Sequence, residues 1–523
     1  MTLFANENNG TPVQWDLPAI VSTRNGVTFD PRCDVWSYVD GTKSIYINLT
    51  KLVNIGKELL WGITKTLIWF SENMAPRTLT ASFNDFCVLL KSITENHAGP
   101  LLSITGTDLL NGRAALRDIY HNDSHLRRCR PFLKKLSKLG YPGISPCGQK
   151  YLKELTLKTS ATGTSTTLLD PHQGPFTDLE RESILDALCA GYACGLISIE
   201  RYVLAWLIAL FGQRPTQYAM LKLCDFLILK DGDCTRHVLR IPLAKGKNEV
   251  DRNRAQEFDL IPELALLIIE YKSRILLQFT GVLADPEQAP FFPSRSARRK
   301  ANANGLEYHM LSVTITDELR RTYLALDVKS ERTGKQINFN TYRFRRTVGT
   351  NCIREGLGIM GTAMRLGQTT TLSVRCYVSL AAAFELHDRI EFSTAARLGT
   401  LAQVFKGVLV TTETDKNPAP ISHIVNPLVD PTMKSPMGSC GKDSFCSFNK
   451  PIACYSCLLF RAWLDGPHQK VYDYLEADKQ RLIDSGCPDT IVRINNRALL
   501  AVASVIMMCK EEYAKRALAV LSK

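Results

Sequence analysis

The chain has 523 residues, of which 45% are hydrophobic and 22% charged, and this composition excludes a largely disordered, collagen-like or disulfide-framework protein. Its length predicts two to four domains, at about 100–200 residues each. The net charge of +13 indicates a polyanionic partner, either nucleic acid or an anionic membrane surface.

The membrane alternative is weak. No run of about 18 apolar residues occurs, and the best candidate, residues 203–211, ends at Gly212. The first residues lack a basic stretch followed by an apolar core, so no signal peptide is expected. We therefore expect a cytoplasmic protein whose 16 cysteines are reduced thiols or metal ligands.

The first part of the chain divides into two expected segments. Residues 1–51 are rich in Val, Ile, Tyr, Asn and Gly, which predicts a strand- and turn-rich N-terminal arm. Residues 52–158 carry apolar residues at three- and four-residue spacing, which predicts a helical domain. Its end, 127–158, is basic and fits either a phosphate-binding face or an ordinary solvated face.

A Ser/Thr/Gly/Pro-rich stretch, 159–175, is predicted to be a linker. Thr177 and Glu180 then form a capping-box pattern. The region to about residue 400 is predicted to hold helices at 179–193, 197–211 and 262–278, a β-hairpin at 226–229 and 237–242, and further helices after 341. Residues 401–523 form a final cysteine-bearing module. The predicted class is mainly α with a small β-sheet, that is α+β.

Five features of the 177–390 region occur in a fixed order. Arg214 follows a glycine turn at the end of an apolar helix, and Lys245 lies in a β-hairpin. Tyr342-Arg343-Phe344-Arg345-Arg346 opens a helix, Leu366-Gly367-Gln368 follows, and Tyr377 comes nine residues after Gln368.

This set resembles the catalytic domain of the tyrosine recombinases, the phage-integrase family. The resemblance covers about 177–390 by motif, and 52–158 only by position and helical character. It implies a helical core-binding domain and a catalytic domain that clamp duplex DNA. It also implies catalytic roles for Arg214, Lys245, Tyr342, Arg345, Gln368 and Tyr377.

The chemistry can also be argued from the residue types. A tyrosine phenol can attack a phosphodiester and hold the phosphate covalently, so rejoining needs neither ATP nor metal. Two arginines can clamp the non-bridging oxygens with planar donor forks. A lysine can protonate the leaving 5′ oxygen.

Two positions depart from the family pattern, because Tyr342 and Gln368 stand where the family usually has histidine. Tyrosine is a poor general base at neutral pH, since its ordinary pKa is about 10, so proton abstraction from Tyr377 rests elsewhere or is slow. The hairpin lysine is Lys245 or Lys247, and the family pattern favours Lys245. The predicted DNA contacts are Arg127, Arg128, Arg130, Lys134, Lys135, Arg343 and Arg346, and the basic stretch 294–300 is a further candidate or a solvated loop.

A second signal lies in the C-terminal module. Cys440, Cys446, Cys454 and Cys457 follow a C-x5-C-x7-C-x2-C spacing, with His468 downstream. Four such ligands can form a structural zinc site, and His468 could replace one cysteine. The alternative is a set of small buried residues in a cysteine-rich chain.

The sequence therefore predicts a site-specific recombinase or integrase that forms a 3′-phosphotyrosyl intermediate and moves a mobile genetic element. Its expected partners are double-stranded DNA and three further copies in a tetramer that passes through a Holliday junction, in a bacterial, nucleoid-associated setting. No cofactor is expected for catalysis. The alternatives are a type IB topoisomerase-like enzyme, a catalytically weak DNA-binding relative, and a zinc protein for protein contacts.

Overall fold

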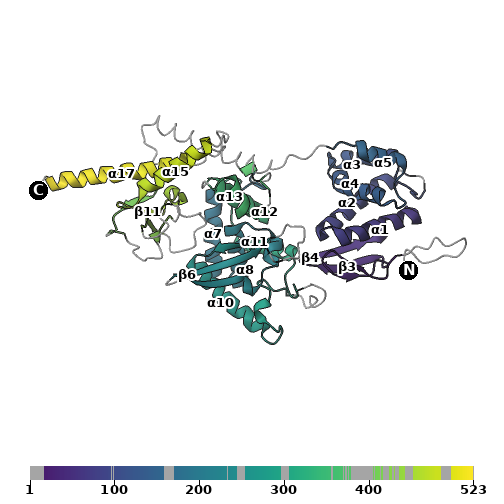
Figure 1. The fold of residues 1–523 in the computed structure, drawn as a ribbon, viewed down its shortest axis with the longest axis horizontal. Helices are drawn as coiled ribbons and strands as arrows, with labels where there is room; N and C mark the ends of the chain where they lie inside the picture. Colours follow the sequence, from purple (N-terminus) through teal and green to yellow (C-terminus); the bar gives the residue numbers. More distant parts are fainter. Residues whose placement is uncertain are drawn as a thin grey trace.

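A computed structural model gives the fold of the chain (Figure 1). It describes residues 17–377, apart from gaps at 96, 98, 158–169, 232–233, 244–251, 253, 296–304, 355–356, 369, 372–373 and 375. Beyond residue 400 it describes 405, 407–412, 414–415, 423–426, 429, 435–441, 452–484 and 496–521.

The N-terminal unit combines short strands with a helix bundle. Its strands form two antiparallel pairs, β1 (Val21–Ser22) with β2 (Thr28–Phe29) and β3 (Val35–Asp40) with β4 (Lys43–Asn48). Its helices are η1 (Leu49–Lys51), α1 (Lys57–Asn73), α2 (Pro76–Thr94), α3 (Gly106–Tyr120), α4 (Ser124–Leu139) and α5 (Pro146–Glu154).

Strands and helices of this unit share one apolar core. Trp36, Ile45 and Ile47 from β3 and β4 are buried together with Leu59 and Phe86 from the helices. The alternation along β4 buries every second residue, as expected for a strand with one face on a core. The strands therefore cover the helix bundle, and the predicted division of the chain at residue 51 stays a prediction.

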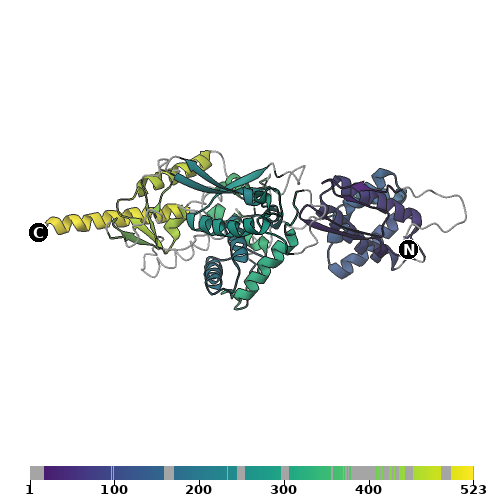
Figure 2. The same ribbon diagram turned by 90° about the horizontal axis from the view of Figure 1, so that it is seen from below.

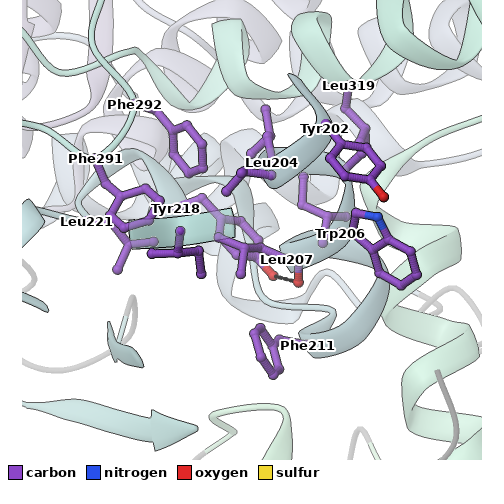
Figure 3. Packing of buried hydrophobic residues seen from close by; sticks show 14 of the residues in the cluster. Tyr202, Leu204, Trp206, Leu207, Phe211, Tyr218, Leu221, Phe291, Phe292 and Leu319 are labelled. Atoms are coloured by element: carbon purple, nitrogen blue, oxygen red, sulfur yellow. Dashed lines mark hydrogen bonds between the residues drawn. The ribbon is translucent and has the colours of Figure 1, made fainter. Parts of the chain in front are cut away.

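The central unit is built around the apolar helix α8 (Ile199–Phe211). Residues 202–208 of α8 are all buried, which is typical of a helix surrounded by other elements. Figure 3 shows Leu204, Trp206 and Leu207 packed among Phe291, Phe292 and Leu319. The surrounding elements are α7 (Asp178–Ala193), α9 (Pro215–Ala219), η2 (Leu223–Asp225), α10 (Pro262–Phe279), η3 (Pro286–Gln288), α11 (Ser312–Leu326), α12 (Thr341–Arg354) and α13 (Gly358–Arg365).

A three-stranded antiparallel sheet flanks this core, with β6 (Cys234–Pro242) between β5 (Phe226–Asp231) and β7 (Ala255–Asp259). The predicted hairpin corresponds to β5 and β6, while β7 was not predicted. The predicted capping box is confirmed, since the Glu180 N–H donates to Thr177 Oγ1 at 3.0 Å.

The C-terminal module has its own core. A four-stranded sheet with the order β8-β11-β10-β9 consists of β8 (Val408–Val410), β9 (His423–Ile424), β10 (Gly438–Cys440) and β11 (Phe460–Trp463). It packs with η6 (Ile452–Ser456), α15 (His468–Asp484) and α17 (Asn496–Leu521).

The three units follow one another along the long axis of the molecule (Figures 1 and 2). The turn between β3 and β4 reaches the central unit, where the Ser312 N–H at the start of α11 donates to the Thr42 carbonyl at 3.0 Å. The end of the predicted linker is held by α12, because the Gly174 carbonyl accepts from Arg343 Nε at 2.9 Å. The α+β class is confirmed. None of the helices in the described part of the chain has the length and apolar character needed to span a bilayer.

Candidate active site

The site begins at the turn between α8 and α9. Gly212 ends α8 with a φ of +57°, and a β-carbon there would stand 3.1 Å from Arg345 Cα. Glycine is therefore required both by the left-handed backbone and by the close approach of α12. Arg214 follows as the N-cap of α9, and its backbone N–H donates to Gln217 Oε1 at 3.1 Å.

The Arg214 guanidinium is partly buried and has one donor atom that is unpaired within the described part of the chain. Its Nη1 atom is buried and has no hydrogen-bond partner among the described residues. Burial lowers the pKa of Arg214, and the nearby hydroxyls of Tyr342 and Tyr377 act in the opposite direction. A buried cationic donor without a partner is a candidate anion ligand, since leaving it unpaired costs free energy.

Arg345 joins two parts of the site. From α12, its Nη1 donates to the Gly212 carbonyl at 2.9 Å and its Nη2 donates to the Leu366 carbonyl at 2.6 Å. Burial lowers its pKa to about 10, and the neighbouring Arg214 acts in the same direction. A guanidinium carries five N–H donors, so donors remain for a further acceptor.

Leu366-Gly367-Gln368 ends α13 next to these arginines. Gly367 has a φ of +57°, and a β-carbon there would stand 3.0 Å from Leu243 Cδ2, so this turn also favours glycine. The Gln368 N–H donates to the Ala363 carbonyl at 2.8 Å, and Gln368 Oε1 is buried without a hydrogen-bond partner among the described residues.

The ring of Tyr377 lies against α12, where Gly349 leaves room for it. Gly349 is four residues after Arg345, so the two positions share one face of the helix. Tyr377 is 6% exposed. Burial raises the pKa of its hydroxyl, while the guanidiniums of Arg345, Arg346 and Arg214 act to lower it.

Tyr342 lies in the first turn of α12 and is 56% exposed. Its hydroxyl influences the pKa values of both Arg214 and Arg345. The structure therefore brings Tyr342, Arg345, Arg214 and Tyr377 together, although they are separated by up to 163 positions in the chain.

The hairpin lysine is the sixth predicted catalytic residue. Strand β6 ends at Pro242, whose carbonyl accepts from Gln217 Nε2 at 2.9 Å, and the Leu243 N–H donates to the Arg254 carbonyl at 2.9 Å. The β6–β7 connection thus starts beside Arg214 and Gly367. Lys245 and Lys247 themselves lie outside the described residues, so the choice between them stays a prediction.

The prediction that Arg343 contacts DNA is wrong. Its side chain is fully buried, where it donates to the Gly174 and Asn338 carbonyls at 2.9 Å and to Glu180 Oε2 at 3.2 Å. The guanidinium also stacks over Phe176, 4.1 Å from the ring centroid. Arg343 therefore fastens α12 to α7 and to the segment before it. Arg346 is half-buried and donates to the Gln173 carbonyl.

The basic helix α4 turns its cationic side chains in different directions. Arg128 pairs with Asp85 at 2.7 Å, Arg130 donates to the Leu152 carbonyl at 3.1 Å, and the Lys135 ammonium lies 3.5 Å from the Trp69 ring centroid. Arg127 is half-buried, whereas Lys134 is exposed. Three of the cationic side chains of α4 therefore contact other residues of the N-terminal unit. The DNA contacts predicted for the basic residues of α4 stay predictions.

The cysteine cluster is only partly described. The Cys440 thiol is close enough to Cys457 to help raise its pKa, which burial raises first. No group of three or more His, Cys, Asp or Glu side chains in the described residues could hold a metal ion, and Cys446 lies outside them. His468 is occupied, because its ring nitrogens lie 2.6 Å from Tyr455 Oη and 2.7 Å from the Trp463 carbonyl.

Two residues of the site carry no recognisable pattern in the amino-acid sequence. Gly349 is an ordinary mid-helix glycine in sequence, and Gln213 is the unremarked neighbour of Arg214. The basic stretch 294–300 is described only at Ser294 and Arg295, where Arg295 lies 3.4 Å from Glu200.

No protein-family model and no curated protein matches the chain. Solved structures of tyrosine recombinases do match it. XerH recombinase bound to palindromic difH substrate is 15% identical, with 66% of this chain and 92% of that chain covered and a TM-score of 0.39. A lambda integrase dimer bound to a COC' core site is 13% identical, covering 61% and 75%, with a TM-score of 0.39. The Tn1549 transposon integrase in complex with transposon right end DNA is 13% identical, covering 60% and 93%, with a TM-score of 0.38. Because these TM-scores are low, the functional assignment rests on the geometry of the site.

Proposed function

We propose that the protein is a tyrosine-type site-specific recombinase that cleaves and rejoins double-stranded DNA through a 3′-phosphotyrosyl intermediate. One observation carries this proposal. The ring of the buried Tyr377 packs against Gly349, one helical turn from Arg345, and Arg345 donates to the Gly212 carbonyl beside Arg214, whose Nη1 has no protein partner among the described residues.

The proposed reaction is a transesterification. Tyr377 Oη attacks the scissile phosphorus and forms a new P–O bond, while the bond to the 5′ oxygen breaks. The 5′ oxygen leaves as a hydroxyl after taking a proton from Lys245. Rejoining is the reverse reaction with a 5′ hydroxyl as the nucleophile, so the ester supplies the bond energy and no cofactor is consumed.

The two arginines stabilise the transition state. Arg214 would bind a non-bridging oxygen with its unpaired Nη1, and Arg345 would use donors left over from its bonds to Gly212 and Leu366. Tyr342 and the Gln368 amide can each donate a further hydrogen bond.

The nucleophile has no histidine base in this proposal. Burial raises the pKa of the Tyr377 hydroxyl, so the phenol is protonated at neutral pH before DNA binds. The proton of the phenol therefore passes to a non-bridging oxygen of the bound phosphate or to water, while the guanidiniums of Arg214 and Arg345 favour the phenolate electrostatically, and we expect a slow chemical step.

The wider setting follows from the same proposal. The N-terminal unit would serve as a core-binding domain, and the two units would clamp duplex DNA. Strand exchange would proceed through a Holliday junction in a homotetramer, and integration or excision of a mobile genetic element is the proposed role.

A nicked suicide substrate tests the chemistry. Cleavage frees a short fragment that carries the 5′ hydroxyl, and when this fragment diffuses away the covalent adduct can no longer be rejoined. We expect wild-type protein and Tyr46→Phe, a surface control, to form the adduct and Tyr377→Phe to form none. An adduct with Tyr377→Phe, or no adduct with wild type, would falsify the assignment. A supercoil-relaxation assay beside a two-site recombination assay separates a topoisomerase from a recombinase.

A structural zinc ion in the C-terminal module is a separate proposal. Its support is the spacing of Cys440, Cys446, Cys454 and Cys457 together with the proximity of the Cys440 and Cys457 thiols. Metal analysis of the full chain should give about one zinc per chain. Absence of metal from protein purified under reducing conditions would contradict it.

A further inference from the structure

Gln213 lies between the two turns that carry Arg214 and Gln368. Its side chain is 1% exposed. Its Nε2 donates to the Phe211 carbonyl at 3.2 Å and to the Arg365 carbonyl at 2.7 Å. One buried amide therefore connects the end of α8 with the end of α13, across 152 positions of the chain.

The backbone of Gln213 is fixed from the other side. Its N–H donates to Tyr218 Oη at 3.1 Å, and Tyr218 Oη donates to the Leu207 carbonyl at 2.8 Å. Figure 3 shows this tyrosine within the apolar core. Gln213 is thus anchored to the core of the central unit through its backbone and to α13 through its side chain.

The contacts of Gln213 run parallel to those of Arg345. Gln213 bonds the carbonyls of residues 211 and 365, whereas Arg345 bonds those of residues 212 and 366. At each of the two turns, Gln213 therefore bonds one backbone carbonyl and Arg345 bonds the next one along the chain. Arg345 has a proposed role on the phosphate, whereas the buried side chain of Gln213 donates only to backbone carbonyls among the described residues.

The position of Arg214 depends on this arrangement. Its Nη1 has no protein partner among the described residues, so its backbone has to set where the guanidinium lies. That backbone is fixed by Gln217 on one side and by the preceding residue, Gln213, on the other. The same amide sets the end of α13, three residues before Gln368.

We propose that Gln213 is a positioning residue, whose side-chain amide holds Arg214 and Gln368 at the distance needed to bind one phosphate. This inference rests on the proposed recombinase function. Gln213 does not touch the DNA, and it acts through the two residues that do. A misplacement of about 1 Å can lower a rate by about 100-fold, so loss of the amide is expected to affect catalysis more than DNA binding.

The test compares single-turnover adduct formation on two nicked substrates. One carries the natural scissile phosphate, and the other a methylphosphonate, in which a methyl group replaces a non-bridging oxygen and removes its charge. Gln213→Met keeps the side-chain length but loses the donor. We expect it to slow the natural reaction about 10- to 100-fold with DNA affinity nearly unchanged.

The methylphosphonate distinguishes positioning from a general structural defect. The transition state then carries one negative charge fewer and needs less help from Arg214, so the gap between Gln213→Met and wild type should shrink by about tenfold, as it should for Arg214→Ala. Gln480→Met on the surface of α15 is the matched control and should behave as wild type. Gln213→Asn, whose shorter amide can reach one carbonyl only, should give an intermediate defect and serves if Gln213→Met does not fold.

The outcomes separate the two proposals. If wild type forms no adduct, the recombinase function and the inference both fail. The recombinase function stands if wild type forms the adduct and the methylphosphonate partly rescues Arg214→Ala. In that case, wild-type rates of adduct formation for both Gln213 variants overturn the inference about Gln213 alone. An equal loss on the two substrates by a folded variant also overturns it.

Discussion

The ring of Tyr377 occupies the space that a side chain at Gly349 would need. A β-carbon built at position 349 would stand 2.7 Å from Cε2 and 2.9 Å from Cζ of the tyrosine. Such separations are shorter than van der Waals contact, so any larger residue must displace the ring. Gly349 therefore fixes the position of the proposed nucleophile, one helical turn from Arg345.

Gly349→Ala should lower adduct formation about 10- to 100-fold, because it moves Tyr377 away from the phosphate. In a helix interior the same change would otherwise stabilise the fold by about 0.5–1 kcal/mol. Single-turnover adduct kinetics on the suicide substrate measure the effect. Gly361→Ala in α13, where the nearest atom would be at 3.4 Å, is the control. Equal rates for the two variants would contradict the packing argument.

Substitutions of Arg214 and of Arg345 should differ in their effect on the free energy of unfolding, although both residues are needed for catalysis. Arg345→Lys loses buried bonds to two carbonyls and should lower the free energy of unfolding by about 2–4 kcal/mol. Arg214→Lys breaks no bond at the unpaired Nη1 and should cost about 1 kcal/mol or less. Urea unfolding measures both values, and both variants should lose adduct formation by about 100-fold or more. A larger stability loss for Arg214→Lys would reverse the roles assigned to the two arginines.

The pH dependence should reflect the phenol. Burial raises the pKa of Tyr377, so the fraction of phenolate is small at pH 7 and grows as the pH rises. Single-turnover cleavage should therefore speed up between about pH 7 and pH 9, approaching tenfold per pH unit where deprotonation is limiting. A plateau below about pH 8 would show that another group lowers the pKa of the nucleophile or that deprotonation does not limit the rate.

Arg343 should be important for folding and not for DNA contact. Arg343→Met leaves Glu180 buried with one ionic partner fewer, and it removes donors from the Gly174 and Asn338 carbonyls. We expect a loss of about 3 kcal/mol in unfolding free energy. Arg236→Met, in an exposed pair with Asp259, should cost less than about 1 kcal/mol. Comparable losses in the two variants would contradict the buried role.

The exposed Lys134 on α4 should contribute to DNA affinity through the phosphates. Lys134→Ala is expected to weaken binding equally on all sequences and to reduce the slope of log affinity against log salt by about 1. Fluorescence anisotropy at several salt concentrations measures this slope. An unchanged slope would assign the basic face of α4 to solvent.

The order and spacing of the reactive residues, and the helices that hold them, could be predicted from the amino-acid sequence. Periodic apolar residues predicted α7 and α10 closely, because burial on one face imposes the helical period, and an apolar run that ends at Gly212 predicted α8. The glycines at 212 and 367 also mark turns that the chain requires locally. These features depend on neighbours within a few residues, so they can be read without a fold.

Which basic residues face the site depends on how distant elements pack against one another. Arg343 and Arg345 are two residues apart in one helix, so they point to nearly opposite sides, and sequence cannot say which side meets α7 and which meets Gly212. The same holds for Gln213 and Gly349, whose partners lie 152 and 28 positions away. It holds also for the strands before residue 51, whose apolar faces cover helices that follow them. The roles of these residues depend on contacts with residues far away in the chain, so no local sequence pattern predicts them.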